Sequence, residues 1–164
     1  MNLKPLVQPS SNTTKSLSFY IVLLIARVLL GGLMLEAGIN KLISGTFSIS
    51  GYLANGTGPF AQWFATLIPS SPVLNSVVIS GEIIIGIALI FGLLLRLASL
   101  LGAIMMLLYY LPYLPPSQGW INQQIIYMAV FIVLMFAGIG YFLGVDIITQ
   151  KYEKRKSIIR FLFG

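Results

Sequence analysis

Long apolar runs separated by short polar segments dominate the pattern of this chain. Four such runs, at about residues 17–37, 73–95, 97–114 and 121–143, contain few charged residues. A helix needs about 20 apolar residues to cross the hydrocarbon core of a bilayer. The pattern therefore predicts an all-α protein, an integral membrane four-helix bundle that forms a single four-span domain over residues 1–164.

The segment between the first two predicted spans is long and uncharged. Residues 43–72 contain no Lys, Arg, Asp or Glu. Gly, Asn and Pro within residues 51–59 predict turns, whereas residues 60–68 predict a short helix at the membrane interface. We expect this partly helical, extracytoplasmic loop to fold back over the mouth of the bundle.

The third predicted span carries two further signals. Ala98 and Gly102 have the small-xxx-small spacing that allows close contact between membrane helices. Tyr109, Tyr110 and Tyr113 cluster near the far end of the span, as aromatic residues do at a membrane interface.

Basic residues are distributed unevenly across the predicted membrane. The chain has 10 Lys and Arg against 4 Asp and Glu, a net charge of +6. One side holds the N-terminal tail, the turn at Arg96 and a basic tail over residues 146–164, whereas the other side holds only Lys41. Because Lys and Arg concentrate in cytoplasmic segments, we expect a plasma-membrane protein with both termini in the cytoplasm. Membrane lipid, and not nucleic acid, is the partner that this distribution predicts.

The composition restricts the chemistry. Hydrophobic residues make up 57% of the chain and charged residues 9%, and there is no Cys and no His. The usual protein ligands of haem, iron–sulfur clusters, copper and zinc are therefore missing. We expect this chain to hold no haem, metal ion or cluster, so that redox chemistry would need a diffusible cofactor or a partner subunit.

Two charged residues lie deep inside predicted spans. Arg27 is about ten residues into the first span and Glu82 about nine residues into the second, which places both near the bilayer midplane at 1.5 Å per residue. The sequence therefore predicts an Arg27–Glu82 pair that faces the bundle interior. Such a pair either only fixes the helix register or lines a cavity where protons reach a bound molecule.

A second group of polar residues is expected at the outer ends of the helices. Glu36, Asn40 and Lys41 follow the first span, with Glu36 and Asn40 one turn apart. They are either interface anchors or part of a pocket rim that binds substrate. The other candidates for that rim, suited to a quinone head group or a small anion, are Gln123, Gln124, Tyr127 and Trp63.

Several of these residues stand in short motifs that resemble the DoxX/DoxD family of small four-helix membrane proteins. The motifs are Arg27 with Gly31-Gly32, Gly38-Ile39-Asn40-Lys41-Leu42, Gly81-Glu82-Ile83-Ile84-Ile85-Gly86 and Gly92-Leu93-Leu94-Leu95-Arg96. Two further segments are similar to the DoxD branch, namely Gly56-Thr57-Gly58-Pro59-Phe60-Ala61 and Gln118-Gly119.

The resemblance implies a membrane subunit of an archaeal thiosulfate:quinone oxidoreductase. With a separate DoxA-like subunit, such a protein passes electrons from thiosulfate to a membrane quinone in a respiratory chain. Glu82 and Arg27 would then polarise or protonate the quinone oxygens, and Lys41 would help to hold the anionic substrate. The alternative is a non-catalytic accessory subunit of a terminal quinol oxidase or another respiratory supercomplex.

Overall fold

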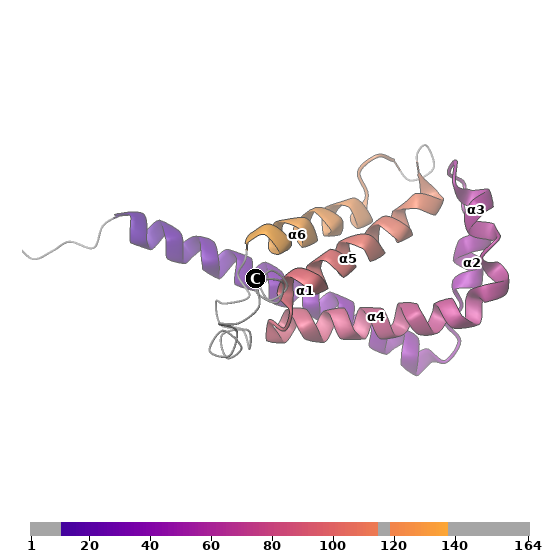
Figure 1. Ribbon diagram of the computed structural model, residues 1–164, viewed down its shortest axis with the longest axis horizontal. Helices are drawn as coiled ribbons and strands as arrows, with labels where there is room; N and C mark the ends of the chain where they lie inside the picture. The colour runs from indigo at the N-terminus through magenta and orange to yellow at the C-terminus, as the bar shows by residue number, and fades with distance from the viewer. Residues whose placement is uncertain (1–10, 115–118, 138–164) are drawn as a thin grey trace, which may run out of the picture.

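The computed structural model describes residues 11–114 and 119–137, with the backbone alone over residues 11–16. All regular structure in these residues is helical (Figure 1). The elements are α1 (Ser11–Ser44), α2 (Ile49–Ala54), α3 (Ala61–Ala65), the 3₁₀ turn η1 (Ile68–Ser70), α4 (Ser71–Phe91), α5 (Leu95–Tyr110), the 3₁₀ turn η2 (Leu111–Tyr113) and α6 (Gln123–Ala137).

Three segments are long and apolar enough to cross a membrane: Leu17–Ser44, Ile68–Phe91 and Leu95–Tyr113. The chain is thus an all-helical protein with the helices of a membrane protein, as predicted. Helix α6 has 15 described residues. The remainder of the predicted fourth span and the basic tail at 146–164 lie outside the described residues, so both stay predictions.

The first helix is longer than the sequence predicted. It does not end at residue 37 but continues to Ser44, where Gly45 takes a positive φ of 61°. Glu36 and Lys41 are compatible with a helix, and their charge does not end it. As a result, Lys41 is a helical residue whose direction is fixed by the register of α1.

Helices α1 and α4 approach closely because glycines stand where they cross. A Cβ atom added at Gly86 would lie 2.6 Å from the backbone nitrogen of Leu35 and 2.8 Å from the carbonyl oxygen of Gly31. One added at Gly38 would lie 3.1 Å from the Cβ atom of Glu82. These contacts, with that of Gly31 against Leu89, set an antiparallel register in which Gly31 is level with Leu89 and Gly38 is level with Glu82.

The second close helix pair is α5 with α6. The ring of Phe131 occupies the space above Gly102, where an added Cβ atom would lie 2.2 Å from Cε1 of the ring. Ala98 is buried on the same face of α5. The predicted small-residue contact is therefore confirmed, and Phe131 is its partner.

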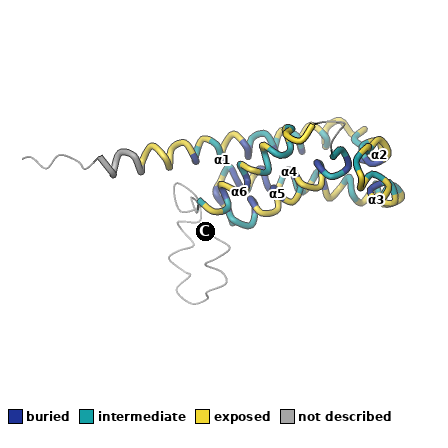
Figure 2. The backbone as a smooth tube through the Cα atoms, turned by 90° about the horizontal axis from the view of Figure 1, so that it is seen from above, coloured by how far each residue is buried: buried dark blue, intermediate teal, exposed yellow. Residues whose placement is uncertain are grey.

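The four long helices are arranged as two pairs and not as an evenly packed bundle. The most extensive contacts are those of α1 with α4 and of α5 with α6. Helices α4 and α5 are joined by the short turn at residues 92–94 and diverge toward α2 and α3 (Figure 1). Residues 17–22 of α1 are exposed, on the part of the helix that extends beyond the other helices (Figure 2).

The predicted loop forms a cap over the open end of α4 and α5. Helix α3 lies within the predicted interfacial helix, but the turns predicted at residues 51–54 are wrong, since α2 occupies them. Ile49 and Leu53 stand one turn apart in α2, and both are buried with Phe64 and Val78. The amides of Thr57 and Gly58 donate to the carbonyl of Pro112 at 3.0 and 2.9 Å, which ties the cap to η2.

The helix crossing predicts opposite effects for two glycine substitutions in α4 and α1. Gly86→Ala should lower the free energy of unfolding by about 1–3 kcal/mol, because its methyl group meets the backbone of α1. Gly32→Ala should leave it unchanged or raise it by up to about 1 kcal/mol, because no atom lies within 4 Å of the new Cβ. Denaturant unfolding of the purified chain in detergent measures both, and equal stability of the two variants would contradict the crossing.

Candidate functional site

A buried polar cluster joins three helices. Lys41 of α1 forms an ion pair with Glu82 of α4, donating from Nζ to Oε1. The hydroxyl of Tyr109, from α5, donates to the same Oε1 atom at 2.8 Å. Glu82 is only 1% exposed. One carboxylate oxygen thus accepts hydrogen bonds from two different helices.

The cluster is nearly neutral in charge and encloses the ammonium group of Lys41. This side chain is 24% exposed, and its nitrogen lies 5.0 Å from the ring centroid of Phe47 and 5.5 Å from that of Tyr109. Aromatic faces stabilise an ammonium group that has lost part of its hydration. The second oxygen of Glu82, Oε2, is buried and accepts no hydrogen bond from the described residues.

The predicted Arg27–Glu82 pair is wrong. Arg27 is buried at 1% exposure on the same face of α1, but it precedes Lys41 by 14 residues, roughly 21 Å along the helix. Gly31 already lies against Leu89 of α4, so Arg27 is level with the end of that helix and not with Glu82. The depth estimate failed because it ended the first helix at residue 37.

A set of tyrosines connects this cluster to the cap. Tyr52 of α2 donates to the carbonyl of Tyr109, and the hydroxyl of Tyr113 donates to the carbonyl of Tyr52 at 3.0 Å. Burial, and then the neighbouring Tyr113, raises the pKa of Tyr52 to about 12. Tyr52 therefore remains protonated, and a hydrogen-bond donor, throughout the physiological pH range.

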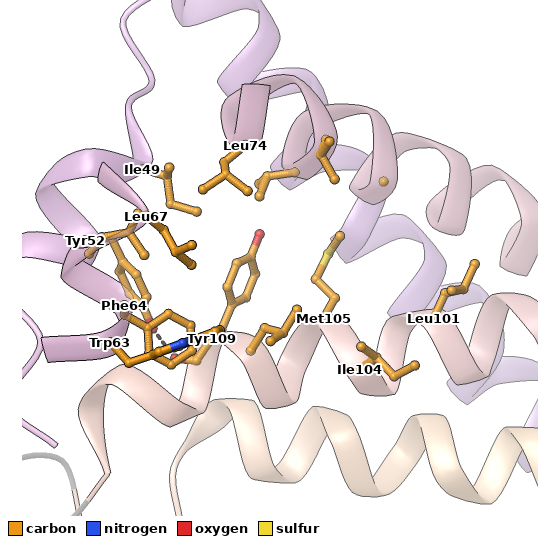
Figure 3. Close-up of a pocket in the computed structure, with 15 residues that line it drawn as sticks. Ile49, Tyr52, Trp63, Phe64, Leu67, Leu74, Leu101, Ile104, Met105 and Tyr109 are labelled. Atoms are coloured by element: carbon orange, nitrogen blue, oxygen red, sulfur yellow. Dashed lines mark hydrogen bonds between the residues drawn. The ribbon is translucent and has the colours of Figure 1, made fainter. Parts of the chain in front are cut away.

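Two hollows adjoin the cluster. The smaller, of about 200 Å³, is lined by Lys41, Phe47, Ile49, Tyr52, Tyr109 and Gln124. The larger, of about 440 Å³, is almost entirely apolar and lies between α4 and α5 under the cap. Tyr109 projects into the middle of this larger pocket with its hydroxyl toward α4 (Figure 3). Ile49, Tyr52 and Tyr109 line both hollows, so the apolar pocket borders the polar one.

The other predicted site residues lie in separate places. Trp63 is exposed and lines the large apolar pocket. Gln123 donates to the hydroxyl of Tyr127 at 2.8 Å, and its neighbour Gln124 is the residue that lines the small hollow. Glu36 and Asn40 are exposed and lie about 140° and 100° around α1 from Lys41. The predicted substrate-binding group is therefore divided between two faces of one helix.

Sequence reasoning missed Tyr109 as a partner of Glu82, and it missed Tyr52. Tyr109 was assigned to an interfacial belt, although it is the tyrosine nearest the interior of its span. Lys41 could have been recognised, because its spacing of 14 residues from Arg27 places both on one helix face. Among the described residues, no group of three or more Asp or Glu side chains could hold a metal ion.

The fold and the site define a helical membrane protein with a buried ion pair beside an apolar pocket. The sequence model of the DoxX family matches residues 22–114, which is more than half of the chain and includes Lys41, Glu82 and Tyr109. The chain therefore belongs to the DoxX family. A search of curated proteins found no match. A search of solved structures also found none.

Breaking the ion pair on one side should be more damaging than replacing both partners. Lys41→Met leaves the carboxylate of Glu82 without its cation in a buried site, so we expect a loss of about 3–5 kcal/mol in unfolding free energy. The double variant Lys41→Met, Glu82→Gln should recover part of this loss, because the neutral amide still accepts from Tyr109. Unfolding titrations in detergent measure both values. A double variant less stable than Lys41→Met would contradict the pair.

Proposed function

We propose that this DoxX-family protein is the membrane subunit of a quinone-linked respiratory enzyme. It binds the membrane quinone beside Lys41, Glu82 and Tyr109, and a separate DoxA-like subunit delivers electrons from thiosulfate. The observation that carries this proposal is the cluster itself, a buried set of donors and acceptors next to an apolar pocket within the membrane-spanning helices.

The side chains around the two hollows fit a quinone head group. Its carbonyl oxygens are neutral hydrogen-bond acceptors, and Lys41 offers an ammonium group that is partly exposed to the smaller hollow. The Gln124 side chain lines the same hollow and carries an amide NH2 group as a second donor, whereas the single hydroxyl proton of Tyr109 is donated to Glu82 and holds its carboxylate beside Lys41. An apolar ring and its substituents suit the neighbouring pocket, whose walls are hydrocarbon.

The same residues could supply protons. Reduction of a quinone to a quinol takes up two electrons and two protons, and the electrons come from the partner. Lys41 and Tyr109 carry exchangeable protons on Nζ and on the hydroxyl oxygen, and both are hydrogen-bonded to Oε1 of Glu82. Glu82 can hold a proton after Lys41 or Tyr109 has given one up, and a positioned acid–base group of this kind contributes about 10²–10⁴-fold to rate.

A neutral ligand suits this site better than thiosulfate. The charge of Lys41 is already balanced by Glu82, so an anion beside Lys41 would also lie close to a carboxylate in a region of low dielectric constant. We therefore infer that Lys41 acts on the quinone, and that thiosulfate is oxidised at the outer surface with the partner. With both termini in the cytoplasm, the cap of α2 and α3 lies on that outer side.

A second candidate function is that of a non-catalytic accessory subunit in a quinol oxidase or another respiratory supercomplex. The face of α1 that carries the exposed Glu36 and Asn40 favours this accessory role. It points away from the other described helices, and polar side chains on a membrane helix can hydrogen-bond to a second membrane helix. The subunits that co-purify in mild detergent separate the two functions. Fixed stoichiometry with oxidase subunits, without thiosulfate-dependent quinone reduction, would favour the accessory role.

The quinone site predicts a loss of activity for a Glu82 variant and different results for variants of two neighbouring tyrosines. In the complex purified from native membranes, Glu82→Gln should reduce the kcat of thiosulfate-dependent quinone reduction by at least about 100-fold. Tyr109→Phe should raise the KM for quinone by about 10-fold, because Glu82 loses the hydroxyl that holds its carboxylate, and with it Lys41, in position. Tyr110→Phe is the matched control, because its hydroxyl donates to the carbonyl of Trp120 and lies outside the cluster.

Two measurements make this test decisive. Co-purification of the partner subunit shows whether each variant still assembles, and extraction followed by chromatography gives the quinone content of the purified protein. We expect full assembly in all three variants and a lower quinone content for Tyr109→Phe than for Tyr110→Phe. Full activity of Glu82→Gln would remove Glu82 from the reaction and leave it a structural role.

A further inference from the structure

The outward face of α1 carries a carboxylate that the described chain does not satisfy. Glu36 and Asn40 are exposed, and no side-chain hydrogen bond or ion pair joins either to the other described residues. The same face continues at spacings of three and four residues through exposed apolar positions and one glycine: Val22, Ile25, Leu29, Gly32 and Ile43. It points away from the buried face that packs on α4.

Glu36 lies at a depth where lipid alone is a poor environment for it. The contacts of Gly31 with Leu89 and of Gly38 with Glu82 place Glu36 level with the middle of α4. Helix α4 has 21 residues and is therefore about 31 Å long, close to the thickness of a bilayer core. A carboxylate at mid-depth on a lipid-facing surface is costly, and ionisable residues in spans nearly always face protein or a water-filled cavity.

Gly32 is the second observation on this face. It stands one turn before Glu36, and a Cβ atom added there would meet nothing within 4 Å. Gly31 and Gly38, in contrast, are both required for the contact with α4. Since glycine weakens a helix relative to alanine, the contacts among the described residues give no reason for Gly32. A small residue on a membrane helix does allow a second helix to approach its backbone.

We propose that this face of α1 binds a membrane-spanning helix of a different chain, which carries Arg or Lys beside Glu36 and crosses α1 at Gly32. The choice of partner follows from charge. A symmetric pair of identical chains meeting along this face would bring Glu36 against Glu36, and two like charges at this depth repel. A cation on the partner helix instead forms an ion pair with Glu36, and Asn40 adds a hydrogen-bonding group one turn away.

This surface is separate from the quinone site. Lys41 follows Glu36 by five residues, about 140° around the helix, and faces α4 and α5. The proposal therefore does not rest on quinone binding, and either one can fail alone. It assigns a place on this chain to the partner subunit and states what that subunit must carry.

The absence of cysteine from the sequence makes a direct test possible. Leu29→Cys, at a residue 67% exposed on this face, is labelled with a photoreactive maleimide on the purified chain in detergent, where no partner covers the thiol, and the labelled chain is then reconstituted with solubilised native membranes and irradiated. Leu42→Cys is the matched control, since Leu42 is 60% exposed but lies about 120° around the helix from Glu36. We expect one adduct with Leu29→Cys, at least about ten times stronger than with Leu42→Cys, and mass spectrometry should place it on an apolar segment that contains Lys or Arg.

Charge reversal decides whether Glu36 is responsible. Glu36→Lys in the Leu29→Cys background should reduce the adduct at least about tenfold, and changing the partner's basic residue to Glu should restore it. Gly32→Leu should also reduce the adduct, while unfolding of the purified chain shows that both variants still fold. An adduct between two copies of this 18.0 kDa chain, an adduct on a helix without a cation, or no change with Glu36→Lys would each overturn the proposal.

Discussion

The carboxylate of Glu82 is the group on which the rest of the structure depends. A lone charge in the middle of a membrane is strongly unfavourable, so Glu82 can exist there only with its partners. Those partners come from two other helices, Lys41 from α1 and Tyr109 from α5. One oxygen atom therefore links the α1–α4 pair to the α5–α6 pair, in addition to the apolar core to which all four helices contribute buried side chains. The register of both pairs must agree for this atom to be satisfied.

The glycine contacts and the cap follow from the same requirement. Lys41 reaches Glu82 because Gly38 and Gly86 allow the backbones of α1 and α4 to approach. On the far side, Tyr109 is held by Tyr52, whose own position is fixed through Tyr113. Helices α4 and α5 are thus joined at their turn and again at the polar cluster, and they diverge between the cluster and the cap. The apolar pocket is the space enclosed by that divergence.

The sequence predicted the features that bilayer thickness imposes and missed those that depend on register. Three spans were found because only long apolar runs can cross a membrane. Glu82 was correctly identified as a buried charge, but its partner was wrong, since an error of a few residues at the end of α1 changes which side chain is level with it. Helix α2 was missed because glycine and asparagine suggested turns, whereas Ile49 and Leu53 bury one helical face.

Two carboxylates at nearly the same depth have opposite environments in this protein. Glu82 is enclosed and paired, whereas Glu36 faces outward from α1 with no partner among the described residues. In the function that we propose, a membrane subunit must admit a diffusing quinone and also contact the chain that supplies electrons. If both contacts used one surface, each would obstruct the other. Because Lys41 and Glu36 lie on opposite sides of α1, the two carboxylates can serve substrate and partner at the same time.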